Sequence, residues 1–322
     1  MSSSKCSLDL YTKFLIANHN RYSGVELSKT SQEALSHDTV SRWLSDQNFS
    51  SDDLWPQVQD LVEKKIGYLI CDDSVLDKRF SRNNELVGRH WSGNEHRLIC
   101  GIDLVNFVWT KGDECIPVDY RIYESEKERK KTKNDHFRDM LDVAKTRVFK
   151  PFYVLADCWY GSVENMKYLQ KLKWKFIFGL KENRKVSLTK NSYIPVSSLD
   201  WSKTLVQKVW LKEFGFVMVA KIVIKDDDIR YAVTDDLSIT DIETFKQHMD
   251  HRWNIETFHR GIKQTTGIEK CYSIKEVTQR NHIFASFVAF ISLERTRLLT
   301  GVSWYEQKAH YGRIGTRMAL CA

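Results

Sequence analysis

Apolar residues recur at helical spacing in the first part of the chain. The spacing predicts three short helices, over residues 8–18, 24–29 and 36–45. The third begins after Ser36, a residue type preferred at helix N-caps, and carries Arg42, as a helix-turn-helix recognition helix does. A plain helical bundle explains the same pattern equally well. Residues 1–64 are therefore predicted to form a small helical domain, with Arg42 as a candidate DNA contact.

From residue 65 the pattern changes to short apolar runs that alternate with amphipathic segments. The predicted order is three strands, a helix, a strand, a helix and a strand. The strands are predicted over 65–71, 97–109, 115–123, 152–156 and 175–180, and the helices from about Phe137 to Ala144 and over 163–172. This order predicts an α/β fold with a mixed sheet that occupies residues 65–185.

Residues 186–240 interrupt this alternation. Strand-like runs over 204–209, 214–224 and 229–233, separated by polar turns, predict a β-rich insertion. Residues 241–322 return to helical spacing, with one long helix predicted over 241–264 and a second tract over 277–299.

Composition narrows the class of protein. With 42% hydrophobic residues and only 4 Pro, the chain fits neither a disordered nor a fibrous protein. No apolar run is long enough to span a bilayer and no signal peptide is evident, so we expect a soluble intracellular protein without a membrane partner. The seven cysteines are odd in number and form no C-x-x-C pair, which predicts reduced thiols packed in the core.

The net charge of +7 is unevenly distributed. Residues 1–60 hold five basic and eight acidic side chains, so the positive excess lies in the rest of the chain. A positive excess favours polyanionic partners.

Two of the predicted strands end in aspartate. The first runs into Asp72 and Asp73, and the fourth runs into Asp157. Open α/β sheets place their chemistry at the carboxyl ends of strands. A single aspartate at such a position usually caps a turn, whereas acids after two strands indicate a shared site.

The predicted helix over 241–264 carries a third acid. Four polar residues lie within about 60° of one another on one face, and an adjoining apolar stripe would dock the helix on the sheet. The polar face holds Arg252, Glu256, His259 and Lys263, and the apolar stripe holds Ile255, Phe258 and Ile262. If only the charge pattern is considered, an exposed helix face with a supportive Arg–Glu pair explains it.

Three neighbouring carboxylates repel one another, so such a cluster shares a proton or binds cations. Oxygen donors without Cys or His partners favour Mg²⁺ or Mn²⁺. Two such ions about 3.5–4 Å apart stabilise the attacking and leaving oxygens of phosphodiester displacement.

The sequence resembles the DDE transposases of bacterial insertion sequences, in the branch marked by a Y-x2-R-x3-E-x6-K signature. Arg252, Glu256 and Lys263 satisfy the last three positions without gaps, while Met249 stands at the tyrosine position. The resemblance implies a ribonuclease-H-like core, in which three strands, a helix, a strand, a helix and a strand precede the glutamate helix. A β-rich insertion lies just before that helix in the family, which agrees with the order predicted above.

The resemblance also implies roles for individual residues. Asp72, Asp157 and Glu256 would be the catalytic, metal-binding triad for two Mg²⁺ or Mn²⁺ ions, with Asp73 as the alternative to Asp72. Arg252 and Lys263 would contact DNA phosphates.

Weaker signals add further candidates. Lys181 follows the fifth strand near the same sheet edge and is a candidate phosphate contact. The basic run over 125–134 would track a DNA backbone or form a solvated loop. Trp201 and Trp210 in the insertion would stack on an extruded base, as in some relatives, or belong to the core.

The expected function is a DNA transposase that cuts the terminal inverted repeats of an insertion sequence and joins the 3′-hydroxyl to target DNA. Family analogy implies a homodimer on double-stranded DNA, associated with the nucleoid in a bacterial cytoplasm. One alternative is a DNA-binding regulator or inactive derivative with a vestigial acid cluster, which Met249 favours. Another is a glycosidase with paired carboxylates, which gives Arg252 and Lys263 no clear role.

Overall fold

The computed structural model describes residues 6–31, 35–81, 83–92, 97–124, 131–224 and 228–321. In this part of the chain, helices flank an 11-stranded mixed sheet. The helices are α1 (Leu8–Ala17), α2 (Gly24–Thr30), α3 (His37–Asp46), α4 (Trp55–Val58), α5 (Lys133–Thr146), α6 (Val163–Leu172), α7 (Ile242–Asp250), α8 (Trp253–Thr266), α9 (Glu276–Thr300) and α10 (Trp304–Leu320).

The strands follow the predicted order, with three short additions. They are β1 (Tyr68–Asp77), β2 (Gly88–Ser92), β3 (Arg97–Thr110), β4 (Ile116–Tyr123), β5 (Tyr153–Ala156), β6 (Phe176–Leu180), β7 (Lys185–Ser187), β8 (Ile194–Pro195), β9 (Val206–Leu211), β10 (Gly215–Val223) and β11 (Ile229–Thr234). The short strands β2, β7 and β8 were not predicted. Strand β2 pairs with the start of β3, and β7 pairs with β8 and β9.

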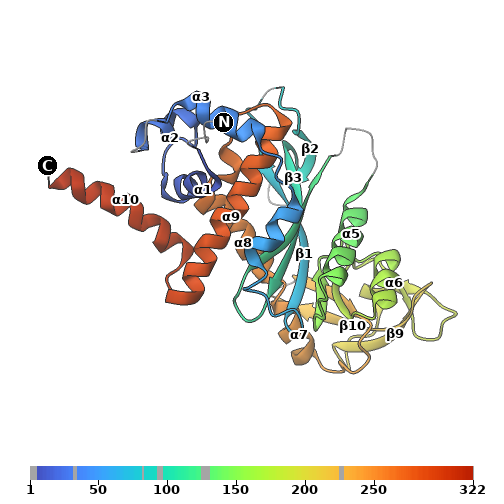
Figure 1. Cartoon of the computed structure of the whole chain (residues 1–322). Helices are drawn as coiled ribbons and strands as arrows, with labels where there is room; N and C mark the ends of the chain where they lie inside the picture. The colour runs from blue at the N-terminus through green and yellow to red at the C-terminus, as the bar shows by residue number, and fades with distance from the viewer. Residues whose placement is uncertain are drawn as a thin grey trace.

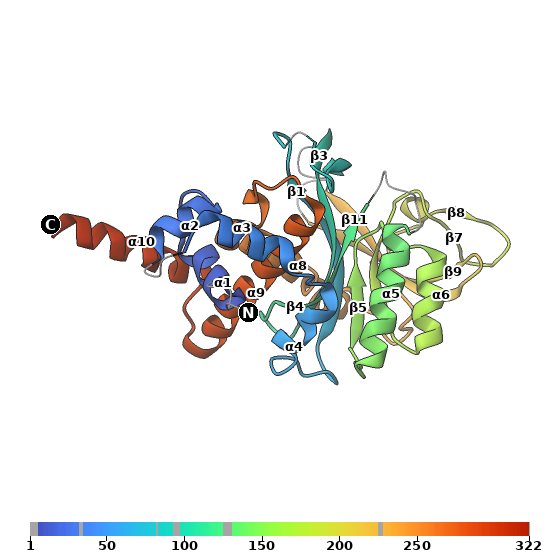
Figure 2. The same cartoon turned by 45° about the horizontal axis from the view of Figure 1, so that its top comes forward.

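The sheet is antiparallel on one side and parallel in its middle. Strand β3 pairs antiparallel with β4 and with β1, while β1, β5 and β6 are parallel neighbours. Helices α5 and α6 cover one face of the sheet, and helices from both ends of the chain cover the other face (Figures 1 and 2). The first three predicted strands therefore form an antiparallel unit, and the next two continue the sheet in parallel with β1.

The β-rich insertion extends the same sheet. Strand β11 pairs antiparallel with β6, and β10, β9, β7 and β8 follow outward in that order. The three strands predicted within this segment correspond to β9, β10 and β11.

The prediction of one long helix over residues 241–264 is wrong, because the chain forms α7 and α8 with a break between them. At the break, Arg252 N donates to Met249 O at 2.9 Å and Asn254 N donates to His251 O at 3.1 Å, which are tight turns in place of helical bonds. The ring of His251 stacks on Tyr68 of β1 with centroids 4.2 Å apart. This contact with the sheet lies at the point where the chain changes direction between α7 and α8.

The predicted N-terminal helices are present as α1, α2 and α3. Ser36 caps α3 as predicted, since its side chain accepts from Thr39 N. Helices α1 and α3 pack against α9, and Tyr11 Oη lies 2.9 Å from His282 Nδ1. The predicted tract over 277–299 corresponds to α9, whereas α10 was not predicted and projects from the body of the molecule (Figure 1).

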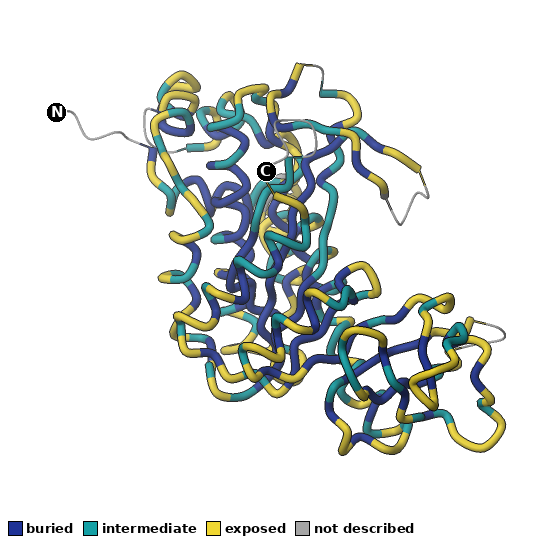
Figure 3. The backbone as a smooth tube through the Cα atoms, turned by 90° about the vertical axis from the view of Figure 1, so that its right-hand side faces the viewer, coloured by how far each residue is buried: buried dark blue, intermediate teal, exposed yellow. Residues whose placement is uncertain are grey.

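Buried residues form a continuous core through the sheet and the helices on both faces (Figure 3). All seven cysteines are described and are free thiols. Cys6, Cys71, Cys115 and Cys271 are buried as predicted, but Cys158 and Cys321 are exposed, because they lie in a loop and at the end of α10. Among the described residues, no helix combines the length and apolar character that crossing a bilayer requires.

Candidate active site

Asp72 and Asp157 lie side by side. The parallel ladder between β1 and β5 ends with Cys71 opposite Ala156, so the two aspartates follow at adjacent positions. Neighbouring strands are about 4.8 Å apart. The prediction that the first strand ends before Asp72 is wrong, because pairing with the long strand β3 carries β1 on to Asp77.

The loop after β5 is held tightly against β6. Trp159 N donates to Asp157 Oδ1 at 2.9 Å. A Cβ atom at Gly179 of β6 would lie 2.7 Å from Cys158 N, and one at Gly161 would lie 2.9 Å from Gly179 O. Glycine at both positions therefore allows the close approach that fixes the backbone around Asp157.

Helix α8 brings the third acid to the same place. Glu256 lies in its first turn, and Ile255, Phe258 and Ile262 are buried, so the predicted apolar stripe docks the helix. Asp72, Asp157 and Glu256 line one cleft of about 1180 Å³. The three acids predicted from separate segments thus each contribute to the lining of this cleft.

Arg252 lies between two of these acids. Its Nη2 donates to Glu256 Oε1 at 2.7 Å, and its Nη1 lies 3.8 Å from Asp72 Oδ2. The guanidinium is largely buried, with 14% of the side chain exposed. Arg252 therefore supplies positive charge inside the acid cluster.

The surroundings of Asp72 and Asp157 disfavour the charged forms of both carboxylates. Burial raises the pKa of Asp72 well above its usual value, and repulsion from Asp157 and Asp73 raises it further, against the lowering effect of Arg252. Burial also raises the pKa of Asp157, against hydrogen bonds from the backbone of Trp159 and Tyr160. Two buried carboxylates in this state gain free energy by binding a cation.

Asp73 has different partners from Asp72, because successive side chains of a strand point to opposite faces. Lys133 Nζ lies 2.6 Å from Asp73 Oδ2, and Tyr160 Oη donates to Asp73 Oδ1 at 3.2 Å. Asp72 instead faces Arg252 on the α8 side. Of Asp72 and Asp73, Asp72 is therefore the acid nearer to Arg252, which also binds Glu256.

Sequence reasoning missed a polar network behind Asp73. Lys133 Nζ also lies 2.6 Å from Asp103 Oδ2, and His90 Nδ1 lies 3.3 Å from the same oxygen. Asp103 of β3 is fully buried, and all three residues line the cleft. An aspartate inside the apolar run over 97–109 was the available signal, because a buried charge requires a partner.

His259 and Lys263 complete the α8 side of the cleft. Asn106 Nδ2 donates to His259 Nε2 at 3.0 Å, and burial lowers the pKa of His259 to about 3, so its ring is neutral. Lys263 Nζ donates to Val75 O at 2.7 Å and lies 3.4 Å from Glu269 Oε1.

The other predicted DNA contacts lie outside the acid cluster. Lys181 Nζ lies 5.7 Å from the ring centre of Trp159, a lining residue, so it stands beside the cleft. Arg42 is exposed on α3 and does not line the cleft. Of the basic run over 125–134, residues 125–130 lie outside the described part, while Thr132 and Lys133 line the cleft.

The two tryptophans proposed for base stacking do not line the cleft. Trp201 donates from Nε1 to Val196 O at 3.1 Å and packs beside Tyr231. Trp210 lies under Lys190 Nζ, which is 4.4 Å from its ring centre.

The donor set fits a hard divalent cation. Carboxylate oxygens, as at Asp72 and Asp157, are the ligands that Mg²⁺ and Mn²⁺ prefer. The raised pKa values of both groups indicate that the surrounding residues do not fully compensate the negative charge of the carboxylates. Among the described residues, however, no three His, Cys, Asp or Glu side chains are already gathered to hold an ion. Glu256 is engaged by Arg252 instead.

A family model described as "Transposase DDE domain" matches residues 75–291, more than half of the chain. This chain belongs to the DDE transposase family. The matched range of this DDE transposase includes Asp157 and Glu256 and begins three residues after Asp72. No curated protein matches the sequence.

A solved transposase structure supports the fold of this DDE transposase. The chain is similar to the piggyBac transposase in a cryo-EM synaptic complex with hairpin DNA, with a TM-score of 0.53 and 12% identity over 95% of this chain and 68% of that chain. A weaker match is the Drosophila P element transposase in a strand transfer complex, with a TM-score of 0.30 and 14% identity over 59% of this chain and 41% of that chain. The mixed α/β architecture is consistent with the predicted ribonuclease-H-like core.

Proposed function

We propose that this DDE transposase cuts phosphodiester bonds at the ends of an insertion sequence and joins the freed 3′-hydroxyl to target DNA. The observation that carries this proposal is that Asp72, Asp157 and Glu256, from three separate elements, line one cleft. The R-x3-E-x6-K spacing of Arg252, Glu256 and Lys263 supports an assignment to the corresponding branch of bacterial insertion sequences, and with it a nucleoid location.

The three acids are the proposed ligands of two Mg²⁺ or Mn²⁺ ions. Ions bound there would activate a water molecule or a 3′-hydroxyl and stabilise the leaving oxygen. The chain holds Asp157 through the loop packed on β6, and it holds Glu256 through the docked helix α8. Arg252 must release Glu256 before this acid takes part, so that its guanidinium becomes free for a DNA phosphate.

Double-stranded DNA is the proposed partner, held by Arg252, Lys263 and Lys181 around the cleft and by Arg42 on α3. Half-exposed Trp159 and Trp253 also line the cleft, and aromatic side chains beside basic ones favour nucleic acid. Two copies would act together, because two DNA ends must be joined to one target.

A second candidate is a DNA-binding regulator with an inactive acid cluster. Met249, at the signature tyrosine position, packs against the core and offers no phosphate contact. The contact between Arg252 and Glu256 also leaves the third acid occupied. Both observations fit a protein that binds DNA without cutting it.

Strand nicking separates the two candidates. The substrate is DNA with the inverted repeats that we expect on both sides of the reading frame, incubated with the full chain and Mg²⁺. A transposase nicks this DNA at the repeat ends, whereas a regulator shifts it in a binding assay and leaves both strands intact. Asp157→Asn provides the control for contaminating nuclease.

A further inference from the structure

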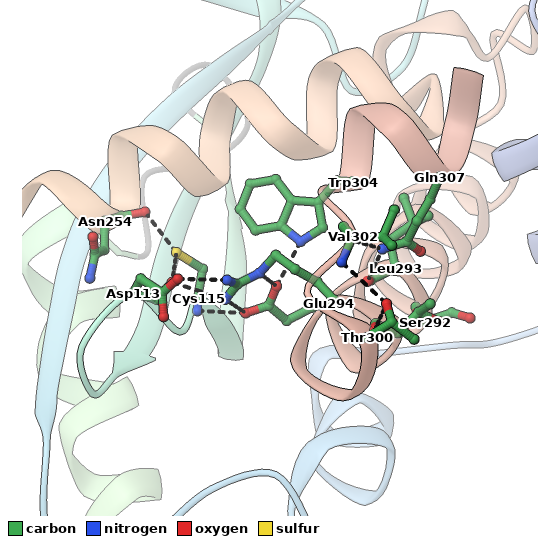
Figure 4. Close-up of polar contacts among 12 residues, drawn as sticks. Asp113, Cys115, Asn254, Ser292, Leu293, Glu294, Thr300, Val302, Trp304 and Gln307 are labelled. Atoms are coloured by element: carbon green, nitrogen blue, oxygen red, sulfur yellow. Dashed lines mark hydrogen bonds and ion pairs between the residues drawn. The ribbon is translucent and has the colours of Figure 1, made fainter. Parts of the chain in front are cut away.

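Glu294 of α9 is a fully buried carboxylate that does not line the cleft. Its oxygens accept from Cys115 N at 2.9 Å, from Trp304 Nε1 at 2.6 Å, and from Arg297 Nε and Nη2 at 2.7 and 2.8 Å (Figure 4). A buried ion pair is often no more stable than apolar side chains of the same volume. Glu294 is therefore better explained by the geometry that it imposes than by stability.

One branch from Glu294 leads to the start of α8. Cys115 follows the turn between β3 and β4, and its Sγ lies 3.4 Å from Asn254 O (Figure 4). Asn254, the second residue of α8, donates from Nδ2 to Thr110 Oγ1 at 2.6 Å and to Gly112 O at 2.9 Å. The loop between β3 and β4 is thus bound by Glu294, and the same loop binds the first turn of α8.

The other branch leads to the middle of α8. The indole of Trp304, held through Nε1 by Glu294, lies directly on Gly261 of α8. A Cβ atom at Gly261 would lie 2.7 Å from Trp304 Cζ3 and 3.0 Å from Phe290 Cε2. The ring therefore packs on the helix backbone with no space to spare.

Both contact points lie on the back of α8. Asn254 and Gly261 are seven positions apart and so lie within about 20° of each other around the helix. Glu256 and Lys263 each follow two positions later, about 200° further round. Contacts at the back that resist rotation of α8 therefore control the direction of the two side chains at the front.

We propose that Glu294 is a positioning residue of the candidate active site, which sets the rotation of α8 through Cys115 and Trp304. Glu256 and Lys263 then enter the cleft in a fixed direction. This inference rests on the proposed function for its catalytic meaning, but the clamp itself is testable without catalysis.

The test compares Glu294→Gln with Arg295→Ala in the full chain. Glutamine keeps the volume but replaces one acceptor oxygen by a donor that faces other donors. Arg295 is the next residue of α9, and its removal breaks an ion pair with Asp60 that has no link to α8. The control thus changes a charge on the same helix without touching the clamp.

Hydrogen exchange and metal titration give the two readouts. In Glu294→Gln, amide protection across residues 253–263 is expected to fall about tenfold relative to α5, and the half-saturating Mn²⁺ concentration for nicking is expected to rise about tenfold. Trp304→Phe, which removes the Nε1 donor together with the outer ring that packs on Gly261, is expected to shift both readouts in the same direction. If Glu294→Gln does not fold, Trp304→Phe still tests the positioning role.

The outcomes separate the inference from the proposed function. Protection of α8 equal to that in Arg295→Ala, or an unchanged Mn²⁺ requirement in an active variant, overturns the positioning role. If the wild-type chain cuts no DNA, the proposed function fails, while hydrogen exchange still decides whether Glu294 clamps α8.

Discussion

Arg252 Nη2 donates to Glu256 Oε1 at 2.7 Å within the acid cluster of the cleft. The same guanidinium lies 3.8 Å from Asp72 Oδ2, so one side chain faces two of the three proposed metal ligands. A divalent cation bound between these acids competes with the arginine. Metal binding and release of Arg252 toward a DNA phosphate are therefore expected to be coupled.

Removal of this arginine is expected to tighten metal binding in the absence of DNA. Arg252→Ala takes a competing charge out of the cluster, and we expect Mn²⁺ affinity to rise about tenfold by calorimetry. DNA affinity is expected to fall in the same variant. Arg260→Ala is the matched control, because Arg260 also lines the cleft. Weaker or unchanged Mn²⁺ binding in Arg252→Ala would show that the guanidinium does not compete.

Asp157→Asn is expected to separate activity from stability. Without this carboxylate, Mg²⁺-dependent nicking should fall at least about a hundredfold, since a proposed metal ligand is lost. The metal-free protein should melt at a higher temperature, because burial disfavours the charge at this position, while an amide oxygen still accepts from Trp159 N. Nicking at the wild-type rate would remove Asp157 from the triad.

His282 is expected to make stability fall at acidic pH. Its Nδ1 accepts from Tyr11 Oη and its Nε2 donates to Gly267 O, and burial lowers its pKa from the usual 6.5 to about 4. Between these values the unfolded chain binds a proton that the folded chain does not, so the free energy of unfolding decreases as the pH falls.

Urea titrations from pH 7 to pH 4 measure this effect. His282→Gln is expected to reduce the pH slope by about one proton. His310→Gln, which changes an exposed histidine of α10, serves as the control and should leave the slope unaltered. Equal slopes in the wild type and His282→Gln would mean that other groups account for acid unfolding.

The separate positions of the three acids were accessible from the sequence. Asp157 follows a buried strand as the apolar pattern predicted, and the spacing around Glu256 was contained in one contiguous segment. The register of β1 was not accessible, because pairing with β3 carries the strand past Asp72. The ion pairs of Lys133 with Asp73 and Asp103 were missed because they depend on the pairing of β1 with β3 and on the packing of α5 against the sheet.

Helix α10 was missed although a local signal was present. Ser303 caps the helix by accepting from Glu306 N, and Ser-x-x-Glu is a recognised start signal for a helix. The break before α8 had no comparable signal. It coincides with the packing of His251 on Tyr68, a tertiary contact that helical periodicity cannot reveal.

Lys263 is expected to act as a phosphate contact that is independent of sequence. Its Nζ donates to Val75 O and lies 3.4 Å from Glu269 Oε1, so the ammonium group must leave these partners to reach DNA. Lys263→Ala should weaken binding to all DNA sequences and reduce the slope of log affinity against log salt by about one unit. Lys13→Ala is the control, because Lys13 pairs with Asp9 on the exposed face of α1. If the slope of Lys263→Ala matches that of the control, Lys263 serves to tie α8 to β1 rather than to bind phosphate.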